Sequence, residues 1–335
     1  MNKKEKFDRY GWKCNETNLA TLPDSAPQEA KDLTKWLTLE GRRSSLQEYI
    51  DCVGTDGRIH GKFWHIGAWT HRKSHSSPNQ ANIASVFEGT PTNPVEEIKA
   101  KYDGRIRHLF KGDQWLVGTD ADGIQLRILA HLMKSPEYTE AILKGDKSKG
   151  TDIHSMNMKA LGSVCKSRDV AKTFIYAFLL GAGVAKVAEI LDCTIPQAKT
   201  AIDNFIESLP GLKRLKKIII PRDAARGYFI GLDGRKVPCN SEHLMLAGYL
   251  QNGESVVMKW ACLEWHRSLA STRIRYKMVD DVHDEWQTSV IGTVEEAKIV
   301  GEHQCKSIEK AGEHFGMFCS LAGTTKVGTS WRETH

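Results

Sequence analysis

The chain has 335 residues, of which 40% are hydrophobic and 26% charged, a balance typical of a globular protein with a large core. Its formal net charge of +6 suits a polyanionic partner but is far from that of a histone-like tail. The N-terminal sequence is polar, and the chain has no apolar run long enough to span a membrane, so we expect a cytoplasmic protein without membrane contact. Eight cysteines without CxxC spacing argue against a disulfide framework and against a zinc site.

The first half of the chain predicts both helices and strands. A helix is predicted near residues 29–39, where apolar residues recur at nearly helical spacing, and strand-like pieces follow over 53–70. A Ser-, Pro- and Asn-rich passage over 74–94 predicts a loop. A strand is predicted at 115–120 and a helix at 123–134. The next helix is capped by Ser135, begins at Pro136 and closes at Gly145.

The second half begins with helices and ends with a hairpin and a helix. Residues 155–220 predict helix almost throughout, with breaks at 162, 181–183 and 210–211. A strand at 228–232 leads to a turn at 233–234, then to a long helix at 242–269 and a hairpin of 273–280 with 285–291. The last helix starts at Thr293, where Glu296 completes a capping box, and runs to about residue 314. This mixed order predicts an α+β fold.

Two aspartates stand where a metal-binding carboxylate would be held rigidly. Asp120 ends the predicted strand and is followed at once by a helix, and Asp284 lies far downstream between two strand-like runs. A carboxylate on a fixed support suits a hard divalent cation, and two such acids are what a two-metal phosphoryl-transfer centre requires. A single acid at a strand end is more often simply solvated, so the hypothesis depends on the pair.

Arg168, Lys172 and Tyr176 recur every four residues and form one stripe on a predicted helix. The opposite side of that helix is apolar, with Phe174, Ile175, Phe178 and Leu179. One interpretation is a solvated amphipathic helix with extended side chains. The other is that the stripe lines a cleft, where an arginine and a lysine grip successive phosphates of a nucleotide and the ring packs on its sugar or base.

Three segments, in this order, resemble the signature motifs of family A DNA polymerases in their phage replicative variant. They are Asp120–Arg127, the run Arg168-xxx-Lys172-xxx-Tyr176-xxx-Leu180-Gly181, and Val282-His283-Asp284-Glu285. Further segments match in the same order: Thr70-His71-Arg72 with Pro78-Asn79, Asp152-Ile153-His154, Gly231–Val237 and Leu250-Gln251. The resemblance covers about residues 10–335.

The resemblance implies a right-hand polymerase fold, with an antiparallel palm sheet and a helical fingers subdomain. Residues 1–52 would be a remnant of the thumb, 53–135 the first part of the palm, 136–230 the fingers and 231–335 the second part of the palm. The implied activity is template-directed addition of dNTPs to the 3′ end of a primer on primer–template DNA.

The resemblance also implies a role for each matching residue. Asp120 and Asp284 would coordinate two Mg²⁺ ions, for which Mn²⁺ can substitute, and the backbone carbonyl of Ala121 would be a further ligand. Lys172 would donate a proton to the leaving pyrophosphate. The nucleotide-binding residues would be His154, Arg168, Lys172, Tyr176 and Gln125. The DNA-binding residues would be Arg72, Arg235, Gln251 and His283.

Three positions depart from the pattern of the family. Gln125 replaces a glutamate beside the incoming sugar, so we expect the steric block to a 2′-hydroxyl to persist with a weaker hydrogen bond, and Gln125→Glu to tighten sugar selection. Leu180 replaces a tyrosine at the end of the fingers helix, and Ala247 replaces an asparagine. Together these changes predict a less discriminating enzyme.

Several charged groups have both a functional and a plain interpretation. Glu285, Asp280 and Asp281 would add negative field without ligating metal, or Asp280 and Asp281 are simply a polar hairpin tip. The basic run of Lys213, Arg214, Lys216 and Lys217 could contact DNA, but such a run is more often a solvated helix face. The histidines between residues 60 and 75 have no zinc-binding spacing.

We expect no proofreading exonuclease in this chain and a truncated thumb, so that a separate chain could supply both, docking near Trp12 and Trp36. One alternative is a catalytically weak or inactive DNA-binding subunit of a split polymerase. A second is a single-subunit RNA polymerase, although Glu285 and the pair Phe174 and Tyr176 favour the DNA enzyme.

Overall fold

The structure is a computed structural model that describes residues 7–8, 11–12, 14–19, 22–23 and 25–335. The strands are β1 (Phe7–Asp8), β2 (Gly11–Trp12), β3 (Lys62–Trp64), β4 (Ser74–Ser76), β5 (Lys111–Ala121), β6 (Tyr228–Ile230), β7 (Lys236–Pro238), β8 (Arg275–Val282), β9 (Glu285–Ile291) and β10 (Gly323–Ser330). The helices before residue 180 are α2 (Glu16–Leu19), α3 (Gln28–Asp51), α4 (Pro94–His108), α5 (Ile124–Met133), α6 (Pro136–Leu143), α7 (Ile153–Leu161) and α8 (Arg168–Leu179). The later helices are α9 (Val184–Leu191), α10 (Ile195–Ser208), α11 (Pro210–Arg214), α12 (Ile220–Ala225), α13 (Glu242–Leu269) and α14 (Val294–His314).

The centre of the molecule is an antiparallel sheet in the order β10-β5-β9-β8. Its middle strand β5 pairs along its length with β9 on one side and β10 on the other. Side chains alternate between the two faces of a strand, so Val117 and Thr119 are buried on one face while Asp120 lies on the other. The α+β fold class is therefore confirmed.

One face of the sheet is covered by the two longest C-terminal helices. Helix α14 packs on β5 and β10, and α13 packs on α14 and α5. The rings of Trp265 on α13 and Trp286 on β9 are fully buried, with centroids 6.0 Å apart. These large apolar side chains make this layer a rigid support for whatever the strand ends carry.

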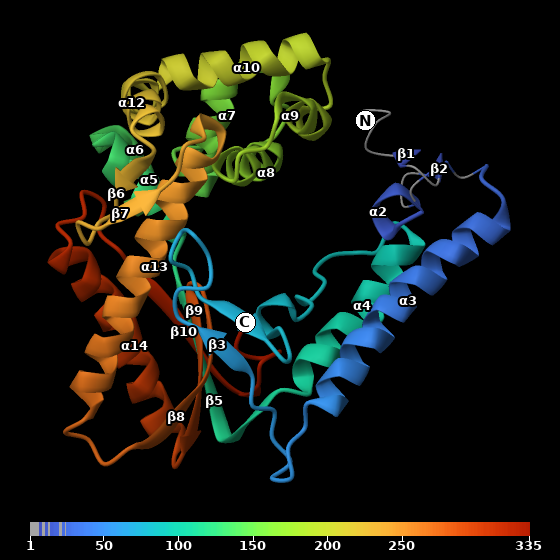
Figure 1. Cartoon of the computed structure of the whole chain (residues 1–335), viewed down its shortest axis with the longest axis vertical. Coiled ribbons are helices and arrows are strands. Elements are labelled where there is room, and N and C mark those ends of the chain that lie inside the picture. Colours follow the sequence, from blue (N-terminus) through green and yellow to red (C-terminus); the bar gives the residue numbers. More distant parts are fainter. Residues whose placement is uncertain (1–6, 9–10, 13, 20–21, 24) are drawn as a thin grey trace.

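Two groups of helices rise from the sheet, as Figure 1 shows. Helices α6–α10 and α12 gather at the top of the view, and α3 runs beside α4 at the right. The upper group is held by an aromatic cluster in which the rings of Phe174, Phe178 and Phe205 lie 5.2–5.6 Å apart. This cluster fixes α8 against α10 and leaves the other side of α8 exposed.

Most predicted elements are confirmed. The strand at 115–120 is β5, the helices predicted at 123–134 and 242–269 are α5 and α13, and the capping box of Thr293 and Glu296 begins α14. The first predicted helix is longer than expected, because α3 continues to Asp51. Between residues 53 and 70 only Lys62–Trp64 forms a regular strand.

Several elements are not predicted by sequence patterns. Strand β4 (Ser74–Ser76) lies in the passage predicted as a loop and is a strand because it pairs with β3. Helix α4 has an Asn93 cap and Pro94 in its first turn, but it buries only a few apolar side chains. Strand β10 reads Gly-Thr-Thr-Lys-Val-Gly-Thr-Ser, with one large apolar residue, and it is a strand because it pairs with β5. Within the described residues, no helix is both long and apolar enough to cross a membrane.

Candidate active site

Asp120 and Asp284 meet where two neighbouring strands end. Asp120 is directly opposite Glu285 in the pairing of β5 with β9, and the backbone N–H of Ala121 donates to the carbonyl oxygen of Asp284 at 3.0 Å. Asp284 is the second residue of a two-residue turn, in which His283 has a φ of 56°. Such a tight hairpin requires a positive φ, and the strain at a non-glycine residue is typical of functional turns.

Both aspartates lie in a strongly negative environment. The Asp120 side chain keeps contact with solvent, yet crowding by protein atoms and the charges of Asp284 and Glu285 raise its pKa to about 8. Burial and the charge of Glu254 raise the pKa of Asp284 to about 7, while Arg72 acts in the opposite direction. Carboxylates that repel one another in this way gain most from a divalent cation.

The donor atoms at this position fit magnesium. The side chains of Asp120 and Asp284 and the backbone of Ala121 offer only oxygen ligands, which Mg²⁺ prefers. No cluster of three or more His, Cys, Asp or Glu with metal-binding geometry exists among the described residues, so a cage built from protein alone is absent there. Mg²⁺ commonly uses one or two carboxylates and completes its shell with water and substrate phosphates.

Glu285 is held by the fold. Its carboxylate accepts from Gln287 Nε2 at 2.5 Å, from Trp331 Nε1 at 2.6 Å and from His335 Nδ1 at 2.9 Å. Burial acts to raise the pKa of Glu285, but these contacts, with the His335 hydrogen bond the strongest, bring it below its usual value. Glu285 therefore stays charged and contributes negative field, with its oxygens already used in structural contacts.

Asp280 and Asp281 are buried in β8, so the interpretation of a polar hairpin tip is wrong. Asp281 forms an ion pair with the buried ammonium of Lys73, and Asp280 Oδ1 lies 3.9 Å from His75 Nδ1. Burial and the charge of Glu285 raise the pKa of Asp280 to about 7. The tip itself is formed by His283 and Asp284, because β8 and β9 pair as far as Val282 and Glu285.

The predicted stripe of α8 is exposed. Lys172, Tyr176 and Leu180 are exposed and Arg168 is half-buried, while Phe174 and its apolar neighbours are buried. The Tyr176 side chain keeps contact with solvent, yet crowding by protein atoms and the charges of Asp284 and Asp120 raise the pKa of its hydroxyl, so this ring lies within electrostatic reach of both acids. No described residue forms an ion pair with Lys172, whose ammonium stays available to a ligand.

Arg168 and His154 are organised by one carboxylate. Asp152 caps α7 by accepting from His154 N at 3.1 Å, and it also accepts from Ser155 Oγ at 2.6 Å and Arg168 Nη2 at 2.9 Å. The His154 ring is buried, with its centroid 6.2 Å from that of Tyr176. Burial and the nearby Arg168 lower the pKa of His154. Arg168 is thus held in an ion pair with Asp152.

Gln125 and Arg72 meet on a side chain that sequence reasoning missed. Glu254 of α13 accepts from Arg72 Nη2 at 2.5 Å and from Gln125 Nε2 at 3.0 Å. A signal for Glu254 exists in the sequence, because it is the one charged residue in the run Asn252–Met258. A charge in the middle of a helix segment that is apolar or small on all sides needs a specific partner.

The other predicted DNA-binding residues lie in different elements. Arg235 is 68% exposed at the turn between β6 and β7, with its Nε 3.5 Å from Asp233 Oδ2. Gln251 is half-buried on α13, and His283 lies at the turn beside His75, with ring centroids 6.2 Å apart. Burial and the charges of Arg72, His75 and Lys73 lower the pKa of His283 to about 4, so it is neutral at physiological pH.

Three of the four residues of the basic run on α11 and the helical segment after it are already engaged. Lys213 and Lys217 both contact the carboxylate of Glu207, and the Lys216 ammonium lies 5.8 Å from the centre of the Phe178 ring. These contacts favour a solvated helix face over a DNA-binding surface. Trp36 is 58% exposed, but the Trp12 side chain and residues 1–6 lie outside the described part of the chain. The expected second chain stays a prediction.

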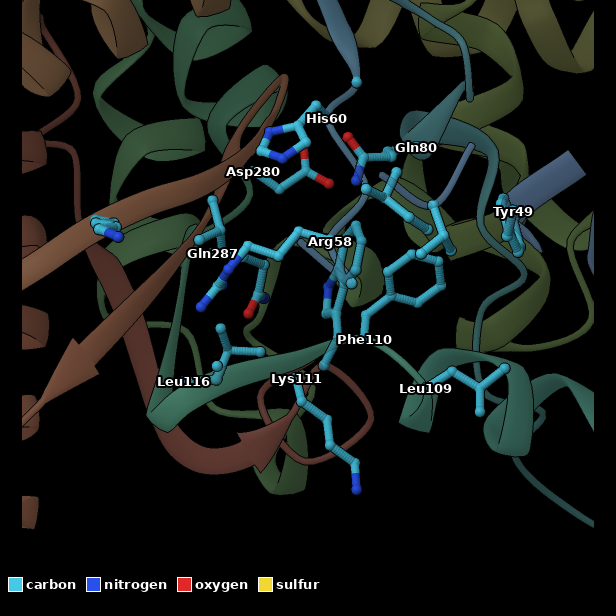
Figure 2. Close-up of a pocket in the computed structure, with 18 of the residues that line it drawn as sticks. Tyr49, Arg58, His60, Gln80, Leu109, Phe110, Lys111, Leu116, Asp280 and Gln287 are labelled. Carbon is cyan, nitrogen blue, oxygen red and sulfur yellow. The ribbon is translucent and has the colours of Figure 1, made fainter. Parts of the chain in front are cut away.

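A separate cavity of about 940 Å³ opens beside the sheet, lined by α3, the 56–61 loop, residues 109–113 and β8. Figure 2 shows Asp280 and Gln287 on the sheet side of this cavity, with Tyr49 and Phe110 on the helix side. Neither Asp120 nor Asp284 lines it. The chemistry of the site therefore rests on the strand ends.

Comparison with known proteins agrees with this geometry. The sequence profile described as "DNA polymerase family A" matches residues 1–333. The chain belongs to DNA polymerase family A. Within this family it is 32% identical over 346 residues to a DNA-directed DNA polymerase of Enterobacteria phage T3, and 31% identical over 346 residues to that of Escherichia phage T7.

These family A alignments cover 94% of the chain and 47% of each phage polymerase, so the chain spans about half the length of these relatives. The fold also matches a solved structure described as "POL domain of Pol1 from M. smegmatis complex with DNA primer-template and dNTP". The TM-score is 0.80 with 20% identity, over 98% of this chain and 57% of the other. The right-hand polymerase fold is therefore confirmed.

Proposed function

We propose that this chain is a template-directed DNA polymerase that extends a primer 3′ end with dNTPs by two-metal phosphoryl transfer. One observation carries the proposal: Asp120 and Asp284 share one corner of the sheet, and Tyr176 of α8 lies within electrostatic reach of both. Two carboxylates and a row of phosphate-binding side chains are the parts that such a transfer needs.

At this corner, Asp120, Asp284 and the carbonyl of Ala121 would hold two Mg²⁺ ions, or Mn²⁺ in their place. When bound, the metal ions would activate the primer 3′-hydroxyl and neutralise the triphosphate. Lys172 has no ion-pair partner among the described residues, so its ammonium can bind the phosphates and give a proton to the leaving pyrophosphate.

The remaining residues bind and orient the substrates. Arg168 and His154 would contact the triphosphate from α8 and α7, while Tyr176 and Gln125 would contact the sugar of the incoming dNTP. The proposed DNA contacts are Arg72, Arg235, Gln251 and His283. The POL domain from M. smegmatis, a complex with DNA primer-template and dNTP, supports these substrate classes.

We also propose that the chain polymerises without proofreading, since the family A profile accounts for residues 1–333. The phage sources of its relatives support work in the cytoplasm of a host cell. The domain limits given above and the residue roles are parts of the same proposal.

The deciding experiment is primer extension with the purified 335-residue chain, with dNTPs or NTPs, in Mg²⁺ or Mn²⁺. We expect extension with dNTPs, and its loss by a factor on the order of 10³ or more in Asp120→Asn and in Asp284→Asn, because each change dismantles the metal-binding pair. Without metal, both variants should melt at a higher temperature than wild type, because each relieves repulsion among carboxylates.

Asp113→Asn is the matched control. Asp113 lies in the same strand as Asp120 but pairs with Arg58 and Ser289, so this variant should keep full activity. Extension with NTPs in preference to dNTPs would identify an RNA polymerase. DNA binding without extension in either metal would favour the non-catalytic subunit, and wild-type rates in either Asn variant would remove the metal assignment.

A further inference from the structure

Glu254 is a fully buried carboxylate in the middle of α13, with no exposed surface. Its neighbours along the helix, from Asn252 to Met258, are all buried as well. A buried charge is costly unless it is paired and hydrogen-bonded, so Glu254 must be retained by specific contacts.

Those contacts join three separate parts of the chain at one oxygen atom. Oε2 of Glu254 accepts from Arg72 Nη2 in the loop before β4 and from Gln125 Nε2 at the start of α5, at 2.5 Å and 3.0 Å. Oε1 of Glu254 has no partner among the described residues. The charge of Glu254 also contributes to the raised pKa of both Asp284 and Asp120, so the contact lies at the edge of the acid pair.

This contact determines which end of the Gln125 amide is free. A primary amide has one donor end and one acceptor end, and the donor Nε2 is turned to Glu254, which can only accept. The acceptor Oε1 of Gln125 is then the end left for a ligand. The hydrogen-bond network rather than the shape of the amide sets this orientation.

We propose that Glu254 is a positioning residue for sugar selection, which it exerts by holding the Gln125 amide and the Arg72 guanidinium in one fixed arrangement. This inference rests on the proposed function, in which Gln125 contacts the sugar of the incoming nucleotide. Glu254 itself, buried beneath them, acts through these two side chains.

The arrangement needs one carboxylate and one amide. A glutamate at position 125 would set two carboxylates about 3 Å apart against a single guanidinium, and like charges at that separation cannot both stay ionised at low cost. A glutamine at position 254 would leave Arg72 without its charged partner. Exchanging the two side chains, Gln125→Glu with Glu254→Gln, restores one of each. This arrangement predicts that Gln125→Glu alone does not tighten sugar selection, in contrast to the sequence-based expectation, and both stay predictions until the variant is measured.

The test is a double-mutant cycle of wild type, Gln125→Glu, Glu254→Gln and the exchanged double variant. The readout is kcat/KM for a dNTP and for the matching NTP. We expect each single variant to lower dNTP efficiency about tenfold and to change the ratio of dNTP to NTP use. The double variant should exceed the product of the single effects by about fivefold or more, and recover most of the wild-type ratio.

A second readout, the melting temperature without DNA or nucleotide, reports the contact independently of activity. Gln125→Glu should lower it by about 2 °C or more, and the double variant should regain the loss. The matched control is Glu264→Gln, the same substitution on the same helix, where the carboxylate pairs with Lys310 at 2.7 Å. That control should leave sugar selection unchanged.

Three outcomes would overturn the inference. Additive single effects in both readouts would mean that Gln125 and Glu254 do not act together. Coupling in melting temperature with an unchanged sugar ratio would make Glu254 a structural residue only. Failure of the wild-type chain to extend a primer would overturn the proposed function, and with it the role of Glu254 in sugar selection. In that case, coupling in melting temperature would still establish the contact between Gln125 and Glu254.

Discussion

The acidic residues of this site differ in whether other side chains of the protein already stabilise their charge. Glu285 accepts hydrogen bonds from three side chains and stays charged, whereas burial and the repulsion of neighbouring carboxylates raise the pKa values of Asp120 and Asp284. Carboxylates that repel one another at a strand end lower the stability of the protein. Such pairs are typical of functional sites, where a bound ligand can offset the repulsion. The difference separates groups that support the site from groups that would meet substrate.

Tyr176 offers a direct test of the site at this scale. Its hydroxyl lies within electrostatic reach of Asp120 and Asp284, and it can supply the hydrogen bond that a nucleotide without a 3′-hydroxyl has lost. We therefore expect the wild-type chain to use dideoxynucleotides readily. Tyr176→Phe should lower the ratio of dideoxy to deoxy incorporation about fivefold, the effect of one hydrogen bond of about 1 kcal/mol.

Competition between labelled ddNTP and dNTP in a single-nucleotide extension assay measures this ratio. Tyr276→Phe is the control, since the Tyr276 hydroxyl contacts His266 at 3.1 Å near the far end of β8. An unchanged ratio in Tyr176→Phe would mean that the exposed stripe of α8 does not face the sugar.

The sequence was sufficient to predict residues whose role depends on local pattern. Asp120 follows an apolar strand, and Lys172 and Tyr176 repeat at helical spacing, so each could be placed without coordinates. Glu254 could not be placed in this way, because its partners Arg72 and Gln125 are distant in the chain and meet it only after folding. The two interpretations of Asp280 could not be separated for the same reason: burial beside His75 is a property of the packed sheet.

The same distinction holds for whole elements. Helix α13 and the hairpin of β8 and β9 carry strong apolar patterns and defined turns, and they were predicted within a few residues. Strand β10 has almost no apolar alternation and exists because the edge of β5 accepts it. The strand is stabilised by its pairing with β5, and the strand propensities of its own residues do not predict that pairing.

Helices α7 and α8 depend on one another through Asp152, and this gives a prediction at the scale of elements. Partial burial acts to raise the pKa of Asp152, but hydrogen bonds from Arg168, Ser155 and the His154 N–H hold it well below its usual range. Asp152→Asn keeps a good helix cap and removes the charge. We expect a loss of about 1–3 kcal/mol in the free energy of unfolding at pH 7.

The pH dependence of this loss follows from the lowered pKa. A carboxyl whose pKa is lower in the folded chain stabilises it above the unfolded pKa of about 4, and that contribution disappears as the pH falls through the folded value. The gap between wild type and Asp152→Asn should be constant above about pH 5 and should shrink below about pH 4. Urea unfolding across this range measures it, and a gap of constant size would show that the charge of Asp152 is not the cause.

Over the whole molecule, positive charge is distributed between sites that are engaged and sites that are open. Lys213 and Lys217 share the carboxylate of Glu207, whereas Arg235 is 68% exposed at the turn between β6 and β7 and has only a longer contact, 3.5 Å from its Nε to Asp233 Oδ2. Phosphate contacts supply most non-specific affinity for DNA, and the counterions that each contact releases on binding add to its salt dependence. The duplex is therefore expected to bind the surface whose lysines and arginines have the weakest contacts with carboxylates of the protein.

Arg235 and Lys217 provide a matched comparison for that surface. Both side chains are more than half exposed, but Lys217 is in close contact with Glu207, whereas the ion pair of Arg235 Nε with Asp233 Oδ2 is longer, at 3.5 Å. Arg235→Ala should weaken binding of primer–template DNA and reduce the slope of log affinity against log salt by about 1, because one phosphate contact is lost. Lys217→Ala should change neither quantity. Fluorescence anisotropy titrations from about 50 to 200 mM salt measure both. Equal slopes for wild type and Arg235→Ala would remove the β6–β7 turn from the DNA surface, and a reduced slope for Lys217→Ala would extend that surface to the helical segment after α11.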